Sequence, residues 1–248
     1  MLKARPFLKW AGGKSQLLDQ NYYPSDLRAG RIRHDVEPFL GGGAVFFAIA
    51  RRYPIKSAWL SDINRDLVLT YQAVQQRPAE LLEVLERYQK EYDRTPEEQR
   101  RDMFLAVRDA FNQSRFDINH ATCAAHWVQR AAQLMFLNKT CFNGLFRLNS
   151  KGAFNVPFGK YKTAVICDAA NLLAASRALQ KAEIRQADST RSAGPRPTKA
   201  RLSILIRPIV HSAGRPVSPP TPAAVFLMLS KSAWPNFSAG WTGKKTPA

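Results

Sequence analysis

The chain has 248 residues, of which 45% are apolar and 23% charged, and its formal net charge is +18. This length suffices for one α/β domain of normal size with a smaller inserted domain. No apolar run approaches the roughly 18–20 residues of a membrane helix, so a membrane-spanning protein is excluded. The positive charge favours a polyanionic partner, because displacing counterions from phosphates favours binding.

The N-terminal segment carries a glycine turn but no export signal. Residues 7–18 predict a glycine turn that leads into a helix. The residues before it lack the apolar core of a signal peptide, so we expect a cytoplasmic protein. Cys123, Cys141 and Cys167 are too widely spaced for a C-x-x-C pair and are expected to be reduced thiols.

Residues 11–15 (Ala-Gly-Gly-Lys-Ser) partly match a P-loop, G-x-x-x-x-G-K-[ST]. The P-loop pattern requires a glycine five residues before Gly13, where this chain has Leu8. The usual phosphate cradle cannot be built without that glycine, so an NTPase is the less favoured alternative.

The next segment has the order of a nucleotide-binding βαβ unit. Glu37 is followed by the glycine turn Gly41–Gly43, and residues 44–50 then predict a helix. Residues 58–62 (Ala-Trp-Leu-Ser-Asp) predict a short buried strand that ends in a carboxylate. Strand, glycine turn, helix, strand and acid is the order expected for nucleotide binding.

Two interpretations of this unit stay open on the residues alone. Glycines let the backbone approach a ligand and place a helix N-terminus beside it, but a tight strand-to-helix connection has the same pattern. Asp62, about 20 residues after the glycines, favours a ligand because its carboxylate can accept hydrogen bonds from ribose hydroxyls. The alternative is that Asp62 caps the following helix.

Residues 64–138 predict mostly helix. Pro78 begins a helix that extends to Tyr92 with its apolar residues along one face. Residues 95–98 (Thr-Pro-Glu-Glu) predict a capping box that starts a second helix, which runs through Phe111. A third helix is predicted over about 121–136.

The stretch after these helices combines cations, amides, aromatics and glycines. Residues 141–161 predict a hairpin-like structure, followed by a helix near 168–180 and a strand over 182–188. Over residues 137–161, Lys and Arg suit phosphates or guanine edges, Asn suits adenine, and aromatics can enter between bases. The composition fits a nucleic-acid surface or an ordinary surface hairpin equally well.

Four segments closely resemble the Dam-type family of DNA adenine-N6 methyltransferases across residues 6–188. They are F-L-K-W-A-G-G-K, E-P-F-L-G-G-G-A-V-F, S-D-I-N-R-D-L and L-N-K-T-C-F-N-G-L-F-R-L-N-S-K-G-A-F-N-V-P-F-G-K-Y. The resemblance implies an α/β fold, a Rossmann-like class I methyltransferase sheet with an inserted helical DNA-recognition domain. It also implies S-adenosylmethionine as the cofactor and double-stranded DNA as the partner, without a metal ion or a membrane.

The resemblance assigns expected roles to single residues. The expected cofactor-binding residues are Trp10, Lys14, Glu37, Gly41, Gly43, Asp62 and Asp188. The expected DNA-binding residues are Lys139, Phe142, Asn143 and Arg147. Phe142 and Asn143 match positions that enter the DNA near a flipped base, and Arg147 matches a guanine-reading position. For members of the GATC type this implies GATC as the methylated site.

The catalytic tetrapeptide of the family is missing. In Asp-Pro-Pro-Tyr, the carboxylate and a proline carbonyl accept hydrogen bonds from adenine N6, the tyrosine stacks on the base, and positioning supplies most of the catalysis. Neither D-P-P-Y nor an N-P-P-Y or S-P-P-Y variant occurs in this sequence. We therefore name no catalytic residue and expect little or no methyl transfer; the alternative is a DNA-binding protein without catalysis.

The composition changes after Asp188. Residues 1–188 contain 28 Lys and Arg against 19 Asp and Glu, whereas residues 189–248 contain 9 Lys and Arg and no acid. Nine of the 16 prolines lie in these last residues, and helical periodicity is lost. Composition alone predicts a disordered basic tail.

A frameshift is the preferred explanation of this tail. Deleting one T from GAC-TTC-GAC-GCG-GTC, which encodes Asp-Phe-Asp-Ala-Val, gives Asp-Ser-Thr-Arg-Ser, the residues at 188–192. Residues 203–210 can be encoded by TCT-ATT-TTG-ATC-CGC-CCT-ATC-GTN. Read in the frame that starts at the third base of the first of these codons, the same bases encode Tyr-Phe-Asp-Pro-Pro-Tyr-Arg. Every Ile codon begins with AT, so Ile204, Ile206 and Ile209 fall where Tyr, Asp and Tyr are required.

These observations divide the chain into four parts. Residues 1–63 are the expected cofactor part of the methyltransferase domain, residues 64–160 the helical recognition domain with the hairpin, and residues 161–188 the return to the first domain. Residues 189–248 are the expected out-of-frame tail. The sheet is therefore expected to lack its later strands and to be less stable than a complete one.

Overall fold

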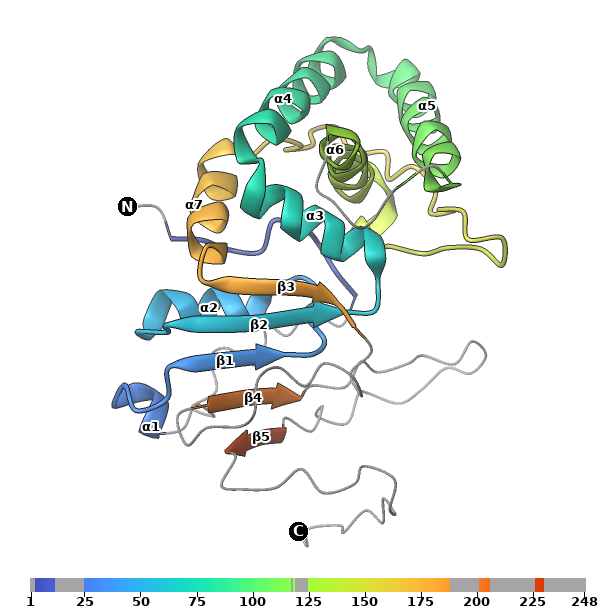
Figure 1. Cartoon of the computed structure of the whole chain (residues 1–248). Helices are drawn as coiled ribbons and strands as arrows, with labels where there is room; N and C mark the ends of the chain where they lie inside the picture. Colours follow the sequence, from blue (N-terminus) through green and yellow to red (C-terminus); the bar gives the residue numbers. More distant parts are fainter. Residues whose placement is uncertain are drawn as a thin grey trace, which may run out of the picture.

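A mixed sheet forms one layer of the protein. The computed structural model describes residues 3–11, 25–116, 118, 125–187, 201–205 and 226–229. Within these ranges five strands pair in the order β3-β2-β1-β4-β5. Their bounds are β1 His34–Glu37, β2 Ser57–Asp62, β3 Ala182–Gln186, β4 Arg201–Leu205 and β5 Phe226–Leu229. Strands β1 to β4 are parallel, and β5 is antiparallel to β4 (Figure 1).

The expected βαβ unit lies at the centre of this sheet. β1 pairs with β2 on one side, with Glu37 opposite Leu60, and with β4 on the other side, with Val36 opposite Ser203. The helix between β1 and β2 is α2 (Ala44–Arg52), whose apolar residues Val45–Ile49 are buried. Parallel strands present their carboxyl ends at one edge, so Glu37 and Asp62 end at the same edge of the sheet.

A group of helices follows β2 and precedes β3. These helices are α3 Arg65–Gln76, α4 Pro78–Arg94, η2 Glu97–Gln99, α5 Arg100–Gln113, η3 Ser114–Phe116, α6 Ala125–Thr140, η4 Phe142–Gly144 and α7 Ala169–Leu179, whereas the short helix α1 (Ser25–Arg28) precedes β1. Residues 63–181 thus connect two strands that are neighbours in the sheet. In Figure 1, α3 to α7 lie on the side of the sheet where β3 is the outermost strand, and β4 and β5 lie on the opposite side.

Helix α6 is the centre of the helical layer. α3, α4 and α5 all pack against it. Most side chains of α6 are buried, among them Trp127, Phe136 and Leu137. A helix with buried residues on most of its sides needs neighbours on most sides, which explains why three other helices pack against it.

Two predicted helix ends are wrong. Thr95 does not start a capping box, because its hydroxyl donates to the Glu91 carbonyl (2.7 Å) and ends α4. A 3-10 turn without a side-chain cap follows, and α5 begins only at Arg100. The hydroxyl thus adds a second hydrogen bond to a carbonyl that already accepts the Thr95 amide (3.0 Å), instead of accepting from an amide of the next helix. Helix α6 ends at Thr140, beyond the predicted Phe136, and residues 121–124 lie outside the described residues.

Two strands that the sequence did not predict follow Asp188. Residues 201–205 and 226–229 form β4 and β5. Both segments are short apolar runs, S-I-L and F-L-M-L, of the kind that pairs in a sheet even where the surrounding sequence is rich in proline. Of the helices that are described, none combines the length and the apolar character needed to cross a membrane.

Candidate functional site

Asp62 joins the end of β2 to the glycine turn after β1. Its Oδ2 accepts a hydrogen bond from the Gly41 amide (3.0 Å), and its Oδ1 accepts one from the Asn64 amide (3.0 Å). The N-cap of α3 is Asn64, whose side chain accepts from the Leu67 amide (3.0 Å), so the alternative in which Asp62 caps this helix is wrong. Each carboxylate oxygen can accept a second hydrogen bond, so Asp62 can hold the turn and a ligand hydroxyl together.

The glycine turn is shaped by close neighbours. Gly41 and Gly43 have left-handed backbones, with φ of +52° and +69°. A Cβ on Gly41 would lie 3.2 Å from Cδ1 of Trp10, so the indole packs directly on the turn. Gly43 ends the turn as the N-cap residue of α2. Trp10, Gly41 and Asp62, which are far apart in sequence, are thus brought together.

Glu37 lies inside the fold. Its side chain is 1% exposed at the end of β1. Tyr71 of α3 is fully buried nearby, and burial, followed by the charges of Glu37 and then Asp62, raises the pKa of its hydroxyl well above its usual value. The phenol therefore stays protonated beneath the turn.

Residues 141–158 form the expected hairpin. Antiparallel bridges join Cys141 to Phe158 and Leu148 to Phe154. At the far end, the Asn149 side chain accepts hydrogen bonds from the amides of Lys151 and Ala153 (both 3.0 Å). Asn is suited to this because its side chain bonds to nearby backbone amides and closes the turn.

The near end of the hairpin exposes two of the predicted DNA-binding residues. Phe142 is 51% exposed, and Asn143, also exposed, has a left-handed backbone with φ of +55°. The Asn143 amide donates to the Tyr161 hydroxyl (3.0 Å), which fixes this strained backbone and leaves the Asn143 side chain at the surface.

Arg147 is held across the hairpin. Its Nε donates to Oδ1 of Asn155 (2.8 Å) and its Nη2 to the Asn155 carbonyl (3.2 Å). A guanidinium has five N–H donors, so these two contacts orient the group and leave donors for a base edge or a phosphate.

Lys139 lies in the last turn of α6 and is half-buried. Burial lowers the pKa of its ammonium group, and the charge of Lys9 lowers it further, partly offset by Asp168. Lys139 lies two residues before Cys141, where the hairpin begins, and its ammonium group senses the charge of Lys9, the neighbour of Trp10.

The two sets of predicted residues meet. Trp10 stacks on Phe146 of the hairpin, with ring centroids 5.2 Å apart and planes inclined by 22°. Nζ of Lys9 lies 5.4 Å from the centre of the Tyr161 ring. The sequence did not single out Phe146, Tyr161 or the buried Asn138 of α6; the signal for Asn138 is an amide inside an apolar helix, where amides are disfavoured.

Two of the expected cofactor-binding residues, Lys14 and Asp188, lie outside the described residues. In the part of the chain that the structure describes, no group of three or more His, Cys, Asp or Glu side chains is arranged to hold a metal ion.

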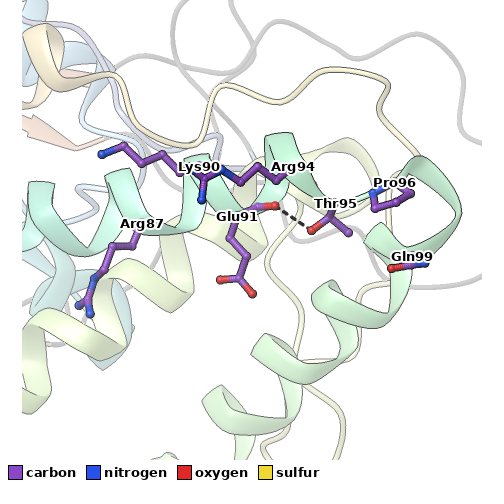
Figure 2. Close-up of a pocket in the computed structure, with 7 residues that line it drawn as sticks. All are labelled: Arg87, Lys90, Glu91, Arg94, Thr95, Pro96 and Gln99. Carbon is purple, nitrogen blue, oxygen red and sulfur yellow. Dashed lines mark hydrogen bonds between the residues drawn. The ribbon is translucent and has the colours of Figure 1, made fainter.

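A separate hollow of about 470 Å³ lies at the junction of α4 and α5 (Figure 2). It is lined by Arg87, Lys90, Glu91, Arg94, Thr95, Pro96 and Gln99. None of the residues expected to bind cofactor or DNA lines it, and it belongs to the outer part of the helical layer. We therefore place the candidate site at the sheet edge and the hairpin.

Comparison with known proteins gives a consistent picture. The family model for the D12 class N6 adenine-specific DNA methyltransferase matches residues 10–193. A Type II methyltransferase M.MjaIII of Methanocaldococcus jannaschii is 43% identical over 185 residues, which are 74% of this chain and 62% of the relative. A DNA adenine methylase of Vibrio cholerae is 36% identical over 164 residues, 65% of this chain and 50% of the relative. The DNA N-6-adenine-methyltransferase of Escherichia phage P1 is 38% identical over 161 residues, 64% of this chain and 18% of the relative. The chain thus spans less than two thirds of the length of each of these relatives.

Proposed function

The chain belongs to the family of D12 class N6 adenine-specific DNA methyltransferases, and from this we propose that its architecture serves methyl transfer from S-adenosylmethionine to N6 of adenine in duplex DNA. One observation carries the proposal. Asp62 holds Gly41, Gly41 packs on Trp10, and Trp10 stacks on Phe146, so the sheet edge and the hairpin form a continuous surface.

The sheet edge suits the cofactor. The Asp62 carboxylate has acceptor capacity for ribose hydroxyls, and the glycine turn lets a ligand approach the backbone. Trp10 offers an aromatic face beside that turn. Lys14, Glu37, Gly43 and Asp188 complete the proposed cofactor set. When bound, S-adenosylmethionine supplies an electrophilic methyl group on a sulfonium.

The hairpin suits duplex DNA. A target adenine must leave the stack to be reached by an enzyme, and we propose that Phe142 and Asn143, both exposed, enter the space that it vacates. The contacts with Asn155 hold the Arg147 guanidinium, which is proposed to read a guanine edge, and Lys139 is proposed to add positive charge at the base of the hairpin. We propose GATC as the recognised sequence.

We further propose that this chain transfers methyl groups poorly or not at all, because no Asp-Pro-Pro-Tyr occurs in it. Two findings support a change of reading frame after codon 188. The family match ends at residue 193, and the regrouped Asp-Pro-Pro-Tyr begins at the position of Ile206, directly after the last residue of β4. β4 is parallel to β1, so its carboxyl end belongs to the same edge as Glu37 and Asp62.

The test compares the full chain with a version whose frame is restored after codon 188. The full chain is expected to bind S-adenosylhomocysteine, and Asp62→Asn is expected to weaken this binding about 10-fold or more, because a hydrogen bond to a charged group is lost. Only the restored version is expected to transfer tritiated methyl groups to a GATC duplex.

Three results would count against the proposal. A folded full chain without affinity for S-adenosylmethionine or S-adenosylhomocysteine would overturn the assigned function. Normal turnover by the full chain would show that another residue replaces the missing carboxylate. A coding sequence whose shifted frame is full of stop codons would remove the frameshift. The alternative, a DNA-binding protein without catalysis, predicts salt-dependent duplex binding on which S-adenosylmethionine has no effect.

A further inference from the structure

The side chain of Asn138 touches both halves of the candidate site. It lies in the last turn of α6 and is 1% exposed. Its Oδ1 accepts a hydrogen bond from the Lys9 amide (2.8 Å), and its Nδ2 donates to the Lys9 carbonyl (2.8 Å). The same Nδ2 donates to the Gly144 carbonyl in the hairpin (2.9 Å). One buried amide thus binds the backbone beside Trp10 and the backbone beside Asn143.

These contacts leave little freedom between the two segments. Both Nδ2 hydrogens of Asn138 are used, so neither segment can move without leaving a buried polar group unpaired. Gly144 has φ of +63°, and the Lys9 side chain fills the space that a Cβ there would occupy. The stacking of Trp10 on Phe146 joins the same two segments a second time.

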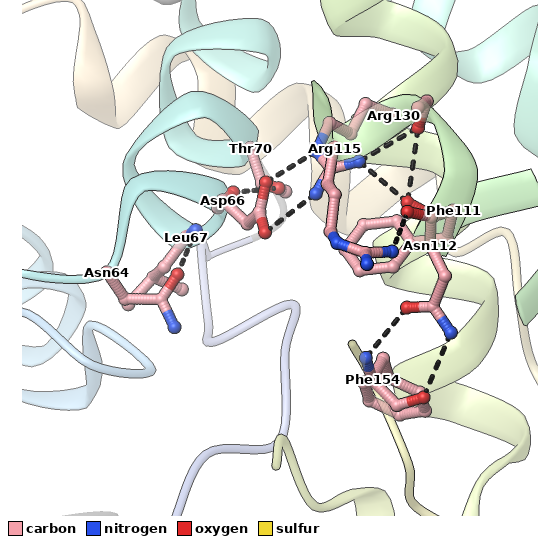
Figure 3. Close-up of polar contacts among 10 residues, drawn as sticks. Asn64, Asp66, Leu67, Thr70, Phe111, Asn112, Arg115, Arg130 and Phe154 are labelled. Carbon is pink, nitrogen blue, oxygen red and sulfur yellow. Dashed lines mark hydrogen bonds and ion pairs between the residues drawn. The ribbon is translucent and has the colours of Figure 1, made fainter. Parts of the chain in front are cut away.

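A second asparagine provides a natural comparison. Asn112 of α5 binds the second strand of the hairpin in the same way. Its Oδ1 accepts a hydrogen bond from the Phe154 amide (2.7 Å), and its Nδ2 donates one to the Phe154 carbonyl (3.1 Å), as Figure 3 shows. Asn112 has no hydrogen bond to residues 3–11 in the described structure. Among the residues that the structure describes, two asparagine side chains thus hold the backbone of the hairpin, and of these two only Asn138 also binds the segment of Trp10.

We propose that Asn138 is a positioning residue that couples cofactor binding to DNA binding. It holds the Lys9–Trp10 segment and the Phe142–Gly144 turn as one unit, so a ligand that orders one of them orders the other. Such coupling is reciprocal, and the cofactor gains from DNA the same factor in affinity that DNA gains from the cofactor. This inference rests on the proposed function, because it assigns one ligand to each segment.

The experiment measures this factor in the full chain. The dissociation constant of a duplex with one GATC site is determined with and without saturating S-adenosylhomocysteine, for the wild type, Asn138→Ala and Asn112→Ala. The wild type is expected to bind the duplex about 10-fold more tightly with the ligand, within the usual range of coupling. The ratio of the two dissociation constants, without and with S-adenosylhomocysteine, measures the coupling. Asn112→Ala is expected to weaken duplex binding but to leave this ratio unchanged, whereas Asn138→Ala is expected to bring it close to 1.

A measurement on the wild type keeps the inference testable should Asn138→Ala fail to fold. In hydrogen exchange, S-adenosylhomocysteine alone is expected to protect the amides of residues 142–146 and to leave residues 149–155 unchanged. The inference is overturned by an unchanged ratio in folded Asn138→Ala, by an equal loss in Asn112→Ala, or by unchanged exchange at 142–146. Should the wild type bind both ligands with a ratio of 1, this inference fails while the proposed function stands; should it bind neither, both fail.

Discussion

Gly43 and Tyr71 are packed so closely that each limits what the other position tolerates. A Cβ on Gly43 would lie 2.5 Å from the Tyr71 hydroxyl oxygen and 3.1 Å from Cε2 of Phe47. The hydroxyl is buried and has no hydrogen-bond partner among the described residues. Close packing against a glycine thus comes with an unsatisfied polar group, a combination that costs stability.

We predict that the stability effects of Gly43→Ala and Tyr71→Phe are not additive. Gly43→Ala is expected to lower the free energy of unfolding by about 2–4 kcal/mol, from the left-handed backbone and the overlap. Tyr71→Phe is expected to be neutral or to stabilise by about 1 kcal/mol, since it removes the unsatisfied hydroxyl. Gly43→Ala should cost less in the Tyr71→Phe background, because the nearest overlapping atom is gone. Urea unfolding of the four proteins tests this, and equal costs of Gly43→Ala in both backgrounds would contradict it.

At the scale of single residues, the sequence picked out several residues that lie together, but not the contacts between them. Gly41 and Asp62 were singled out by their pattern and Trp10 by the family resemblance, and the structure brings the three together. The roles of Phe146, Tyr161 and Asn138 depend on contacts between segments far apart in the chain. A sequence without coordinates contains no signal for such pairings beyond the unusual amide in α6.

Helices α3, α5 and α6 are joined by a buried ion pair. Arg130 of α6 donates through Nε and Nη2 to the Asp66 carboxylate of α3 (2.5 and 2.9 Å; Figure 3). Its Nη1 also donates to the Phe111 carbonyl and the Ser114 hydroxyl at the end of α5 (both 2.8 Å). The two charged side chains are only 5% and 15% exposed. One guanidinium therefore fixes how three helices meet.

We predict that Arg130→Met lowers the free energy of unfolding by about 3–5 kcal/mol, because it leaves the Asp66 carboxylate buried without its partner. Adding Asp66→Asn should restore part of this loss, since the isolated charge is removed. Arg108→Met is the matched control: its ion pair with Asp109 is longer (3.4 Å) and more exposed (29% and 60%), so a change of about 0.5 kcal/mol or less is expected. Chemical denaturation measures all four proteins, and equal losses in Arg130→Met and Arg108→Met would refute the role of the buried pair.

At the scale of elements, periodicity predicted the helices better than their ends. The apolar face of α4 and its Pro78 start are confirmed, because both follow from local sequence. The predicted capping box at Thr95 is wrong because a threonine hydroxyl can bind the last turn of one helix or the first turn of the next. Here it donates to the Glu91 carbonyl in the last turn of α4. Strands β4 and β5 were missed because proline and basic residues around them favour a disordered chain by composition.

The sheet as a whole depends on the last part of the chain. β1 is central only because β4 pairs with it on the side away from β2. Without β4, the N–H and C=O groups along that side of β1 would form an open edge, which invites pairing with other molecules.

We predict that a chain ending at Asp188 unfolds at lower urea concentration than the full chain and self-associates, because β1 becomes an edge strand. A chain ending at Lys231, which keeps β4 and β5, is the control and should match the full chain. Size-exclusion chromatography over a range of concentrations, together with urea unfolding, measures both effects. Equal behaviour of the two truncated chains would mean that β4 and β5 contribute nothing to the sheet.

The long connection between β2 and β3 has a consequence for biosynthesis. The ribosome delivers β1, β2, the whole helical layer and the hairpin before it translates any codon beyond 188, and N-terminal parts of a chain fold first. Strands β4 and β5, which extend the sheet beyond β1, are translated last. An error in the last part of the message therefore changes only these strands and the residues around them. The pairing of β2 with β3 uses residues that were translated earlier and is not affected.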